Sequence, residues 1–381
     1  MSVRRNIFEE VSGHSQNEPQ KTNVIEQGRS QARTAIRYWL ICLFLLVTIM
    51  ILIGGLTRLT DSGLSITEWE LFSGILPPLS EGEWVVAFER YKQIDEWRLQ
   101  KSWMQLDDFK IIYWWEWGHR QFGRIIGFVW AIGFSWFFLR GRIPVGWTAR
   151  LLLIGGLGGV QGFVGWWMVM SGVNPGTGLL DVASYRLSIH LGLAFLVLGF
   201  ISWYIFLLTR EERELIQARR IKEKKQFGLA TGLLYFLFLQ IMVGALVAGI
   251  DAGQTYNDWP LMGGQFFPVD AFIFEPVWRN FFENPGLVQF IHRVLGYVLS
   301  VFGFIVWIFG GKSAHQRTRT AFNMVLLVLI LQVVLGIVTV LYAAPWQIAI
   351  FHQLLAILLW VSILYARFLS AYPIAIAIKN Q

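Results

Sequence analysis

Four of the six histidines lie inside apolar stretches that are long enough to cross a bilayer, while the other two lie in polar segments. The four are His119, His190, His292 and His352. An imidazole inside hydrocarbon is costly unless it binds something, so ionisable groups at such positions indicate functional sites. Four of them predict metal ligands that act in pairs.

The composition predicts a membrane protein. Apolar residues make up 55% of the chain and charged residues only 15%, and the mean hydropathy is +0.50. A spanning helix needs about 20 mostly apolar residues. Eight such runs occur, at 36–56, 112–139, 151–170, 184–208, 227–250, 286–310, 321–342 and 346–369. We therefore expect an all-α polytopic membrane protein with eight transmembrane helices.

The distribution of positive residues predicts the orientation. Arg and Lys are abundant in the connectors 140–150, 210–225 and 312–319, whereas the long connector 251–283 holds five acids and one Arg. Because Arg and Lys accumulate on the cytoplasmic side, both termini are expected in the cytoplasm. The polar segment 1–35 lacks a signal-peptide core and contains acids that a mitochondrial transit peptide avoids, which favours a bacterial inner membrane.

Net charge and cysteine content exclude other classes of function. Membrane topology accounts for the net charge of +7, so the charge gives no reason to expect nucleic acid as a partner. The single cysteine, Cys42, lies inside the first span. Neither an intramolecular disulfide nor a thiolate metal site is therefore expected.

The two halves of the chain resemble each other. Segment 54–63 aligns with 244–253, His119-Arg120 with His292-Arg293, segment 161–165 with 332–336, and His190 with His352. Four matches in the same order predict two parallel four-helix-bundle repeats, related by an axis along the membrane normal. The expected organisation is a polar cytoplasmic segment 1–35, a first repeat 36–210 with a long outer loop 57–111, a cytoplasmic linker 211–226, a second repeat 227–370 and a cytoplasmic tail 371–381.

The four histidines are expected at similar depth near the outer face. The helices that carry them all enter from that side, and the helical rise places each ring about 8 to 11 Å inside. Two helices of one bundle can present imidazoles to opposite faces of a flat ligand, as in bis-histidine haem sites. Zinc or copper is the competing interpretation, but each half offers two histidines and no thiolate, fewer ligands than zinc usually takes.

Residues beside the histidines have two interpretations each. The guanidinium groups of Arg120, Arg124 and Arg293 either extend towards the lipid headgroups or pair with haem propionates. Glycines that flank the site helices either allow close helix packing or make room for a macrocycle.

Glu116 breaks the symmetry between the halves. It precedes His119 by three residues, so both lie on one helix face, whereas Gln289 precedes His292. A membrane glutamate can exchange protons when desolvation raises its pKa, and the alternative is a glutamate that only hydrogen-bonds a neighbour. If one half performs chemistry, the first half is the better candidate.

Asp61 and Asp251 follow the first helix of each half and precede glycine by two residues. Aspartate at such positions mostly forms turns, so a structural role is expected, with a role at the haem edge as the alternative. The long first outer loop is a candidate lid over the first site.

Five stretches together resemble the haem A synthase family. They are 54–69 (GGLTRLTDSGLSITEW), 114–120 (WWEWGHR), 251–262 (DAGQTYNDWPLM), 290–293 (FIHR) and 351–353 (FHQ), and they span nearly the whole chain. Some members carry two cysteines in the first outer loop, and this sequence has none there. It therefore resembles the proteobacterial and mitochondrial branch.

The resemblance implies an oxidoreductase that converts the C8 methyl group of haem O into a formyl group by successive hydroxylations, giving haem A for cytochrome c oxidase. It assigns His119 and His190 to the substrate haem O, Glu116 to catalysis, and His292 and His352 to the iron of a haem b cofactor. The farnesyltransferase that makes haem O, haem O synthase, is the implied substrate donor. The electron acceptor stays unassigned.

Two other functions use the same four histidines. A di-haem b-type cytochrome would only transfer electrons, and a haem chaperone for oxidase assembly would bind haem without changing it. The cytochrome has no need for Glu116, so this carboxylate favours the enzyme over it, and the chaperone differs in releasing its haem reversibly.

Overall fold

The computed structural model describes residues 19–69, 73–176 and 178–374. Eight helices in this part are long and apolar enough to cross a membrane, which confirms the predicted all-α membrane fold. They are α1 (Pro19–Leu59), α3 (Leu106–Leu139), α4 (Thr148–Val169), α5 (Ser184–Leu208), α7 (Lys224–Gly249), α9 (Pro285–Gly310), α10 (Gln316–Leu341) and α11 (Trp346–Ala371). Helices are expected here because hydrocarbon offers the backbone no hydrogen-bonding partner.

Each group of four spanning helices has the same order of neighbours. In the first half, α1 and α4 each pack against both α3 and α5. In the second half, α7 and α10 each pack against both α9 and α11. The histidine-bearing helices α3 and α5 therefore occupy opposite corners of one group, and α9 and α11 occupy opposite corners of the other.

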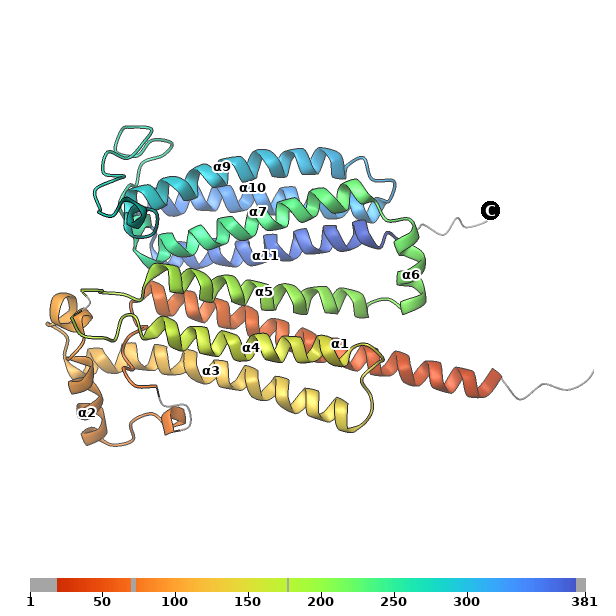
Figure 1. Cartoon of the computed structure of the whole chain (residues 1–381), viewed down its shortest axis with the longest axis horizontal. Coiled ribbons are helices and arrows are strands. Elements are labelled where there is room, and N and C mark those ends of the chain that lie inside the picture. The colour runs from red at the N-terminus through yellow and green to blue at the C-terminus, as the bar shows by residue number, and fades with distance from the viewer. Residues whose placement is uncertain (1–18, 70–72, 177, 375–381) are drawn as a thin grey trace, which may run out of the picture.

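The two groups share a long interface (Figure 1). Helix α5 packs on α7 and α11, and α1 packs on α11. Among the polar contacts across this interface, the Gln353 amide donates to the main-chain oxygen of Ile51 at 2.9 Å, and the Ser188 hydroxyl donates to that of Met242 at 2.8 Å. A Cβ atom on Gly55 would collide with the Gln353 side chain, so a larger residue there would displace this glutamine from its hydrogen bond.

Aspartates end the first helix of each half in the same conformation. Asp61 follows α1 with a φ of 47°, and Asp251 follows α7 near its end with a φ of 50°. A left-handed residue stops an α-helix, and aspartate is one of the few non-glycine residues that tolerate this conformation. Both residues therefore have the turn geometry that the sequence predicts.

The first outer connector is more structured than the sequence predicts. It contains η1 (Ser73–Ile75), α2 (Glu81–Tyr91) and η2 (Trp97–Lys101), and Trp84, Phe88 and Tyr91 of α2 form an apolar cluster with the start of α3. Helix α3 begins before the predicted residue 112, because Asp108 caps it by accepting a hydrogen bond from the Gln105 N–H.

The remaining connectors contain short helices. The second outer connector holds η3 (Ala252–Gln254), η4 (Val277–Arg279) and α8 (Asn280–Glu283), and the predicted linker 211–226 holds α6 (Glu212–Arg220). Figure 1 shows α6, the start of α1 and the end of α11 at one end of the molecule, and α2 at the opposite end. From Pro19 onward the predicted polar segment 1–35 is helical and continuous with the first span.

Candidate functional site

The four histidines lie on the corner helices that face each other within each half. His119 is on α3 and His190 on α5, and their side chains are close enough to interact electrostatically. His292 on α9 and His352 on α11 form the same kind of pair. The fold thus brings the predicted ligands together two by two, each pair drawn from opposite corners of one half.

Every histidine ring packs against a glycine on the neighbouring helix. A Cβ atom built on Gly54 would lie 3.1 Å from His119 Cε1, and one on Gly244 would lie 3.0 Å from His292 Cε1. Gly165 and Gly336 have the same relation to His190 and His352, at 2.9 Å. These four glycines form cradles that fix the rings, and a larger side chain would fill them.

Three of the rings contact a glutamine side chain. The Nε2 atoms of Gln161, Gln240 and Gln332 lie 3.1 to 3.4 Å from ring nitrogens of His190, His292 and His352, respectively. Each also donates to the main-chain oxygen of the same histidine. The sequence alignment paired Gln161 with Gln332 but missed Gln240, because its counterpart in the first half is Met50.

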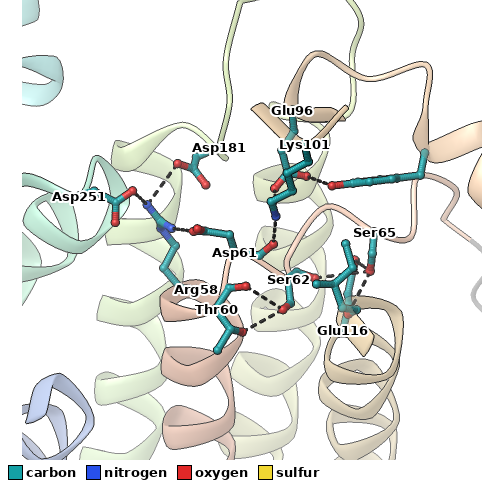
Figure 2. A network of polar contacts seen from close by, with 12 residues as sticks. Arg58, Thr60, Asp61, Ser62, Ser65, Glu96, Lys101, Glu116, Asp181 and Asp251 are labelled. Carbon is teal, nitrogen blue, oxygen red and sulfur yellow. Dashed lines mark hydrogen bonds and ion pairs between the residues drawn. The ribbon is translucent and has the colours of Figure 1, made fainter. Parts of the chain in front are cut away.

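Glu116 is buried and held by donors on both carboxylate oxygens (Figure 2). Its Oε2 accepts from the Ser65 hydroxyl at 2.7 Å and from the Ile66 N–H at 2.8 Å. Its Oε1 accepts from Arg120 at 2.6 Å. These contacts match an ionised carboxylate, which only accepts hydrogen bonds. They fix the group one helical turn from His119.

The arginines that follow two of the histidines bind main-chain oxygens of the outer connectors. Arg120 donates to the oxygens of Ile66 and Glu68. Arg293 donates to those of Tyr256, Asp258 and Leu261. The two arginines thus share one structural function, which is to hold the outer connector onto its helix.

The second half lacks the carboxylate that Arg120 binds in the first. At the position of Glu116, Gln289 is buried and donates to the main-chain oxygen of Tyr256 at 3.0 Å. Its Oε1 has no hydrogen-bond partner. The predicted asymmetry is therefore also a structural one, since only the first half places a charged, well-held acceptor beside its histidine.

A pocket of about 680 Å³ opens between the first outer connector and α3. Ser65 and Arg120, which hold Glu116, both line it, and so does Arg124. None of the four histidines lines it. Glu116 is therefore one contact away from an open pocket on the outer side.

A largely buried arginine joins the two halves at their outer ends (Figure 2). Arg58 binds the carboxylates of Asp61 at 2.6 Å, Asp251 at 2.8 Å and Asp181 at 3.2 Å. Asp61 and Asp181 belong to the first half and Asp251 to the second. Burial raises the pKa of Asp181 to about 6, although the Arg58 charge opposes this shift. Asp61 and Asp251, which the sequence predicts as turn residues, therefore also bind Arg58.

Lys101 links the Arg58 cluster to the outer connector. Its ammonium group donates to the main-chain oxygen of Asp61 and forms an ion pair with Glu96 at 2.8 Å. Burial raises the pKa of Glu96. Arg58, Lys101 and Glu96 could not be singled out from the sequence, because their partners lie in segments that are far apart along the chain or have no distinctive pattern.

The donor sets bear on which metal species can bind. Among residues 19–69, 73–176 and 178–374, no group of three or more His, Cys, Asp or Glu side chains is arranged to hold a metal ion. Zinc usually takes four protein ligands, or three in a catalytic site. Two facing imidazoles match the two axial positions of a haem iron, whose remaining ligands come from the macrocycle.

Comparison with known proteins places the chain in a family. A family model described as "Cytochrome oxidase assembly protein" matches residues 37–364. A heme A synthase of Roseobacter denitrificans is 62% identical over 381 residues, covering all of both chains. One of Ruegeria sp. is 63% identical over 378 residues, 99% of each chain, and one of Dinoroseobacter shibae is 56% identical over 100% of this chain and 99% of its own. The chain therefore belongs to the heme A synthase family.

Proposed function

We propose that this chain oxidises the C8 methyl group of haem O to a formyl group, giving haem A, with haem b as resident cofactor. The observation that carries the proposal is the pairing of His119 with His190 and of His292 with His352, with a held carboxylate, Glu116, beside the first pair only. Membership of the heme A synthase family supports it.

The residues suit two haems. His119 and His190 would hold haem O, and His292 and His352 would hold haem b. The glycine cradles leave each ring packed on one side, and the Oε1 atoms of Gln161, Gln240 and Gln332 are buried without a partner. A histidine that binds iron through one nitrogen carries a proton on the other, and these orphaned acceptors suit that proton.

The chemistry requires a route for protons. As a half-reaction, a methyl group and one water give a formyl group, four protons and four electrons, and haem b would supply the first step of electron transfer to an external acceptor. Glu116 is suited to act as a general base near the reacting group, because two donors fix Oε2 and Arg120 fixes Oε1. The pocket beside Ser65 and Arg120 offers a route to outer water.

Propionate binding by Arg120, Arg124 and Arg293 stays a prediction. Arg120 and Arg293 already bind main-chain oxygens of the outer connectors, so each would have to share its guanidinium group with a propionate. We assign Arg120 first to positioning Glu116, and Arg124, one turn further along α3 and lining the pocket, to a propionate.

The cellular setting is also part of the proposal. The eight spans make the chain a multi-pass membrane protein, and we place it in the bacterial inner membrane with both termini cytoplasmic. Haem O carries a farnesyl chain that partitions into lipid, so haem O synthase in the same membrane is the proposed donor. The exposed apolar side chains of the spanning helices would contact that chain without polar cost.

The central test replaces Glu116 by glutamine. Gln289 shows that this fold tolerates an amide at the equivalent position, so Glu116→Gln is expected to fold and bind both haems but to lose haem A formation at least about 100-fold, the lower range of general-base effects. The matched control is Glu283→Gln, which removes a surface carboxylate that also pairs with an arginine four residues away. Normal turnover by Glu116→Gln would remove the catalytic assignment.

Pigment analysis separates the enzyme from its two alternatives. Haems extracted from the purified protein are separated by chromatography. Haem O, a hydroxylated haem or haem A beside haem b supports the enzyme. Haem b alone, at two per chain, supports a di-haem cytochrome, and haem that is bound reversibly and recovered unchanged supports a chaperone. Loss of haem b in His292→Ala and in His352→Ala would support the assignment of the second pair.

A further inference from the structure

Four helices carry a histidine of the site. For three of them, the spanning helix that comes before carries a glutamine and, four residues later, a glycine. The pairs are Gln161 and Gly165, Gln240 and Gly244, and Gln332 and Gly336. In each case the glycine packs against the histidine ring and the glutamine contacts its ring nitrogens. Helix α1, which precedes the remaining histidine-bearing helix α3, keeps the glycine as Gly54 but has Met50 in place of the glutamine.

Met50 occupies the place that the amide occupies elsewhere. In the second half, Gln240 Nε2 lies 3.4 Å from a Cβ atom built on Gly296, four residues after His292. In the first half, Met50 Cε lies 3.4 Å from a Cβ atom built on Gly123, four residues after His119. A methyl group therefore stands where an amide nitrogen stands in the equivalent site.

The amides can restrain a ligating imidazole in a way that Met50 cannot. Each amide N–H is bonded to the main-chain oxygen of its histidine, at 3.0 to 3.1 Å, while the Oε1 atom is buried and has no partner. Each of these amides therefore carries an unused acceptor beside its histidine, which suits the ring N–H of an iron-bound histidine. A thioether sulfur is only a weak acceptor, and within the described residues the His119 ring forms no hydrogen bond.

We propose that Met50 makes His119 the weakest of the four axial ligands, so that the haem of the first half can exchange while the haem of the second half stays bound. Partners of this kind fix ring orientation and raise ligand basicity. Both histidines of the second half have one, and in the first half only His190 does. This inference rests on the proposed function, in which the first half must release a product in every cycle.

The experiment measures how readily carbon monoxide displaces each axial ligand from ferrous haem. The first site is isolated in a His292→Ala background and the second in a His119→Ala background. In the first background, Met50→Gln is expected to raise the carbon monoxide concentration for half-saturation about 10- to 100-fold, the usual effect of such partners. Met50→Leu, which matches methionine in size and lacks an acceptor, should leave it unchanged.

The mirror substitution tests the same idea in the second half. Gln240→Met in the His119→Ala background should make its haem bind carbon monoxide at a concentration about 10- to 100-fold lower. Gln240→Glu retains an acceptor and should restore resistance. A second-site haem that is equally resistant with Gln240→Met would overturn the proposal. If Met50→Gln takes up no haem, the comparison of Gln240→Met with Gln240→Glu alone tests the proposal.

Failure of this inference is distinguishable from failure of the proposed function. If the first-site haem stays bound with unchanged spectra after His119→Ala, then His119 is not a ligand and the proposed function loses its first site. If His119→Ala removes that haem but Met50→Gln and Met50→Leu give the same half-saturation, the ligand assignment stands and only the function of Met50 is wrong.

Discussion

At the scale of single residues, the contact between glycine and histidine sets the position of each ring. Gly165 leaves 2.9 Å between an added Cβ atom and His190 Cε1, closer than carbon atoms approach without repulsion. Both groups lie on well-packed helices, so the ring would have to move to accommodate a methyl group. The same reasoning applies to Gly54, Gly244 and Gly336.

We therefore expect Gly165→Ala to lose haem from the first half while retaining haem in the second. The measurement is haem content per chain, by pyridine haemochrome, together with the thermal midpoint of the purified protein. Alanine stabilises a helix by about 1 kcal/mol relative to glycine, so the substitution should not weaken the helix itself.

Gly162→Ala is the matched control for this substitution. Gly162 lies on the same helix, and a Cβ atom built there meets nothing within 4 Å. It should keep both haems. Equal haem content in the Gly165→Ala and Gly162→Ala variants would show that the ring does not depend on the cradle.

Residue types and spacing predicted the histidine pairs but not what holds them. An ionisable group in an apolar run is visible in the sequence, and so is the difference between Glu116 and Gln289. The function of Met50 was not visible, because only the three-dimensional match to Gln240 shows that a methyl group has replaced an amide. Arg58 was missed for a similar reason, since its partners come from three separate connectors.

At the scale of elements, the ends of α1 and α7 and the connector before α5 meet around Arg58. Burial raises the pKa of Asp181 to about 6 from an ordinary value of 3.8. Between these two values the folded state binds more protons than the unfolded state, so this group makes the protein less stable as the pH rises from about 4 to 6. The effect is at most about 3 kcal/mol.

Asp181→Asn removes this titration. We expect the thermal midpoint of Asp181→Asn minus that of the wild type to become more positive from pH 4 to pH 7, because the ionisation cost grows only in the wild type. Thermal unfolding of the detergent-solubilised protein at several pH values provides the measurement, and using the difference cancels groups common to both proteins.

Asp258→Asn serves as the control for that series. Hydrogen bonds from the N–H groups of Gly264 and Gly263 lower the pKa of Asp258. The contribution of Asp258 to stability therefore does not change with pH above the ordinary pKa of aspartate. Its difference from the wild type should therefore be flat between pH 4.5 and 7, taking about 4 as the ordinary value. A flat difference for Asp181→Asn as well would mean that Asp181 is already ionised throughout this range.

The spanning helices were predictable because, in hydrocarbon, a long apolar segment can satisfy its backbone hydrogen bonds internally only as a helix. The predicted runs coincide with the eight helices, with ends that differ by several residues. The connectors were less predictable. Helix α2 is short, with only Trp84, Phe88 and Tyr91 buried, and it is stabilised by packing on α3, which no local pattern in the sequence reveals.

At the scale of the whole molecule, the connectors fall into two sets at opposite ends of the bundle (Figure 1). Val145, between α3 and α4, and Phe266, between α7 and α9, are both well exposed, at 97% and 70%. The proposed orientation places Val145 on the cytoplasmic side and Phe266 on the outer side.

In a Cys42→Ser background, a membrane-impermeant maleimide should label Phe266→Cys in cells whose outer membrane has been permeabilised. It should label Val145→Cys only after the inner membrane is also opened. Both variants should label equally in detergent, which controls for reactivity. The reverse pattern of labelling would invert the proposed topology and place both termini outside.

The contact between a helix glycine and the histidine of the next spanning helix occurs four times, once in each of the helix pairs α1 and α3, α4 and α5, α7 and α9, and α10 and α11. The smallest unit that carries the pattern is thus a helical hairpin with one imidazole, half the size of the repeat that the alignment shows. One hairpin cannot clamp a macrocycle from both faces, but two can.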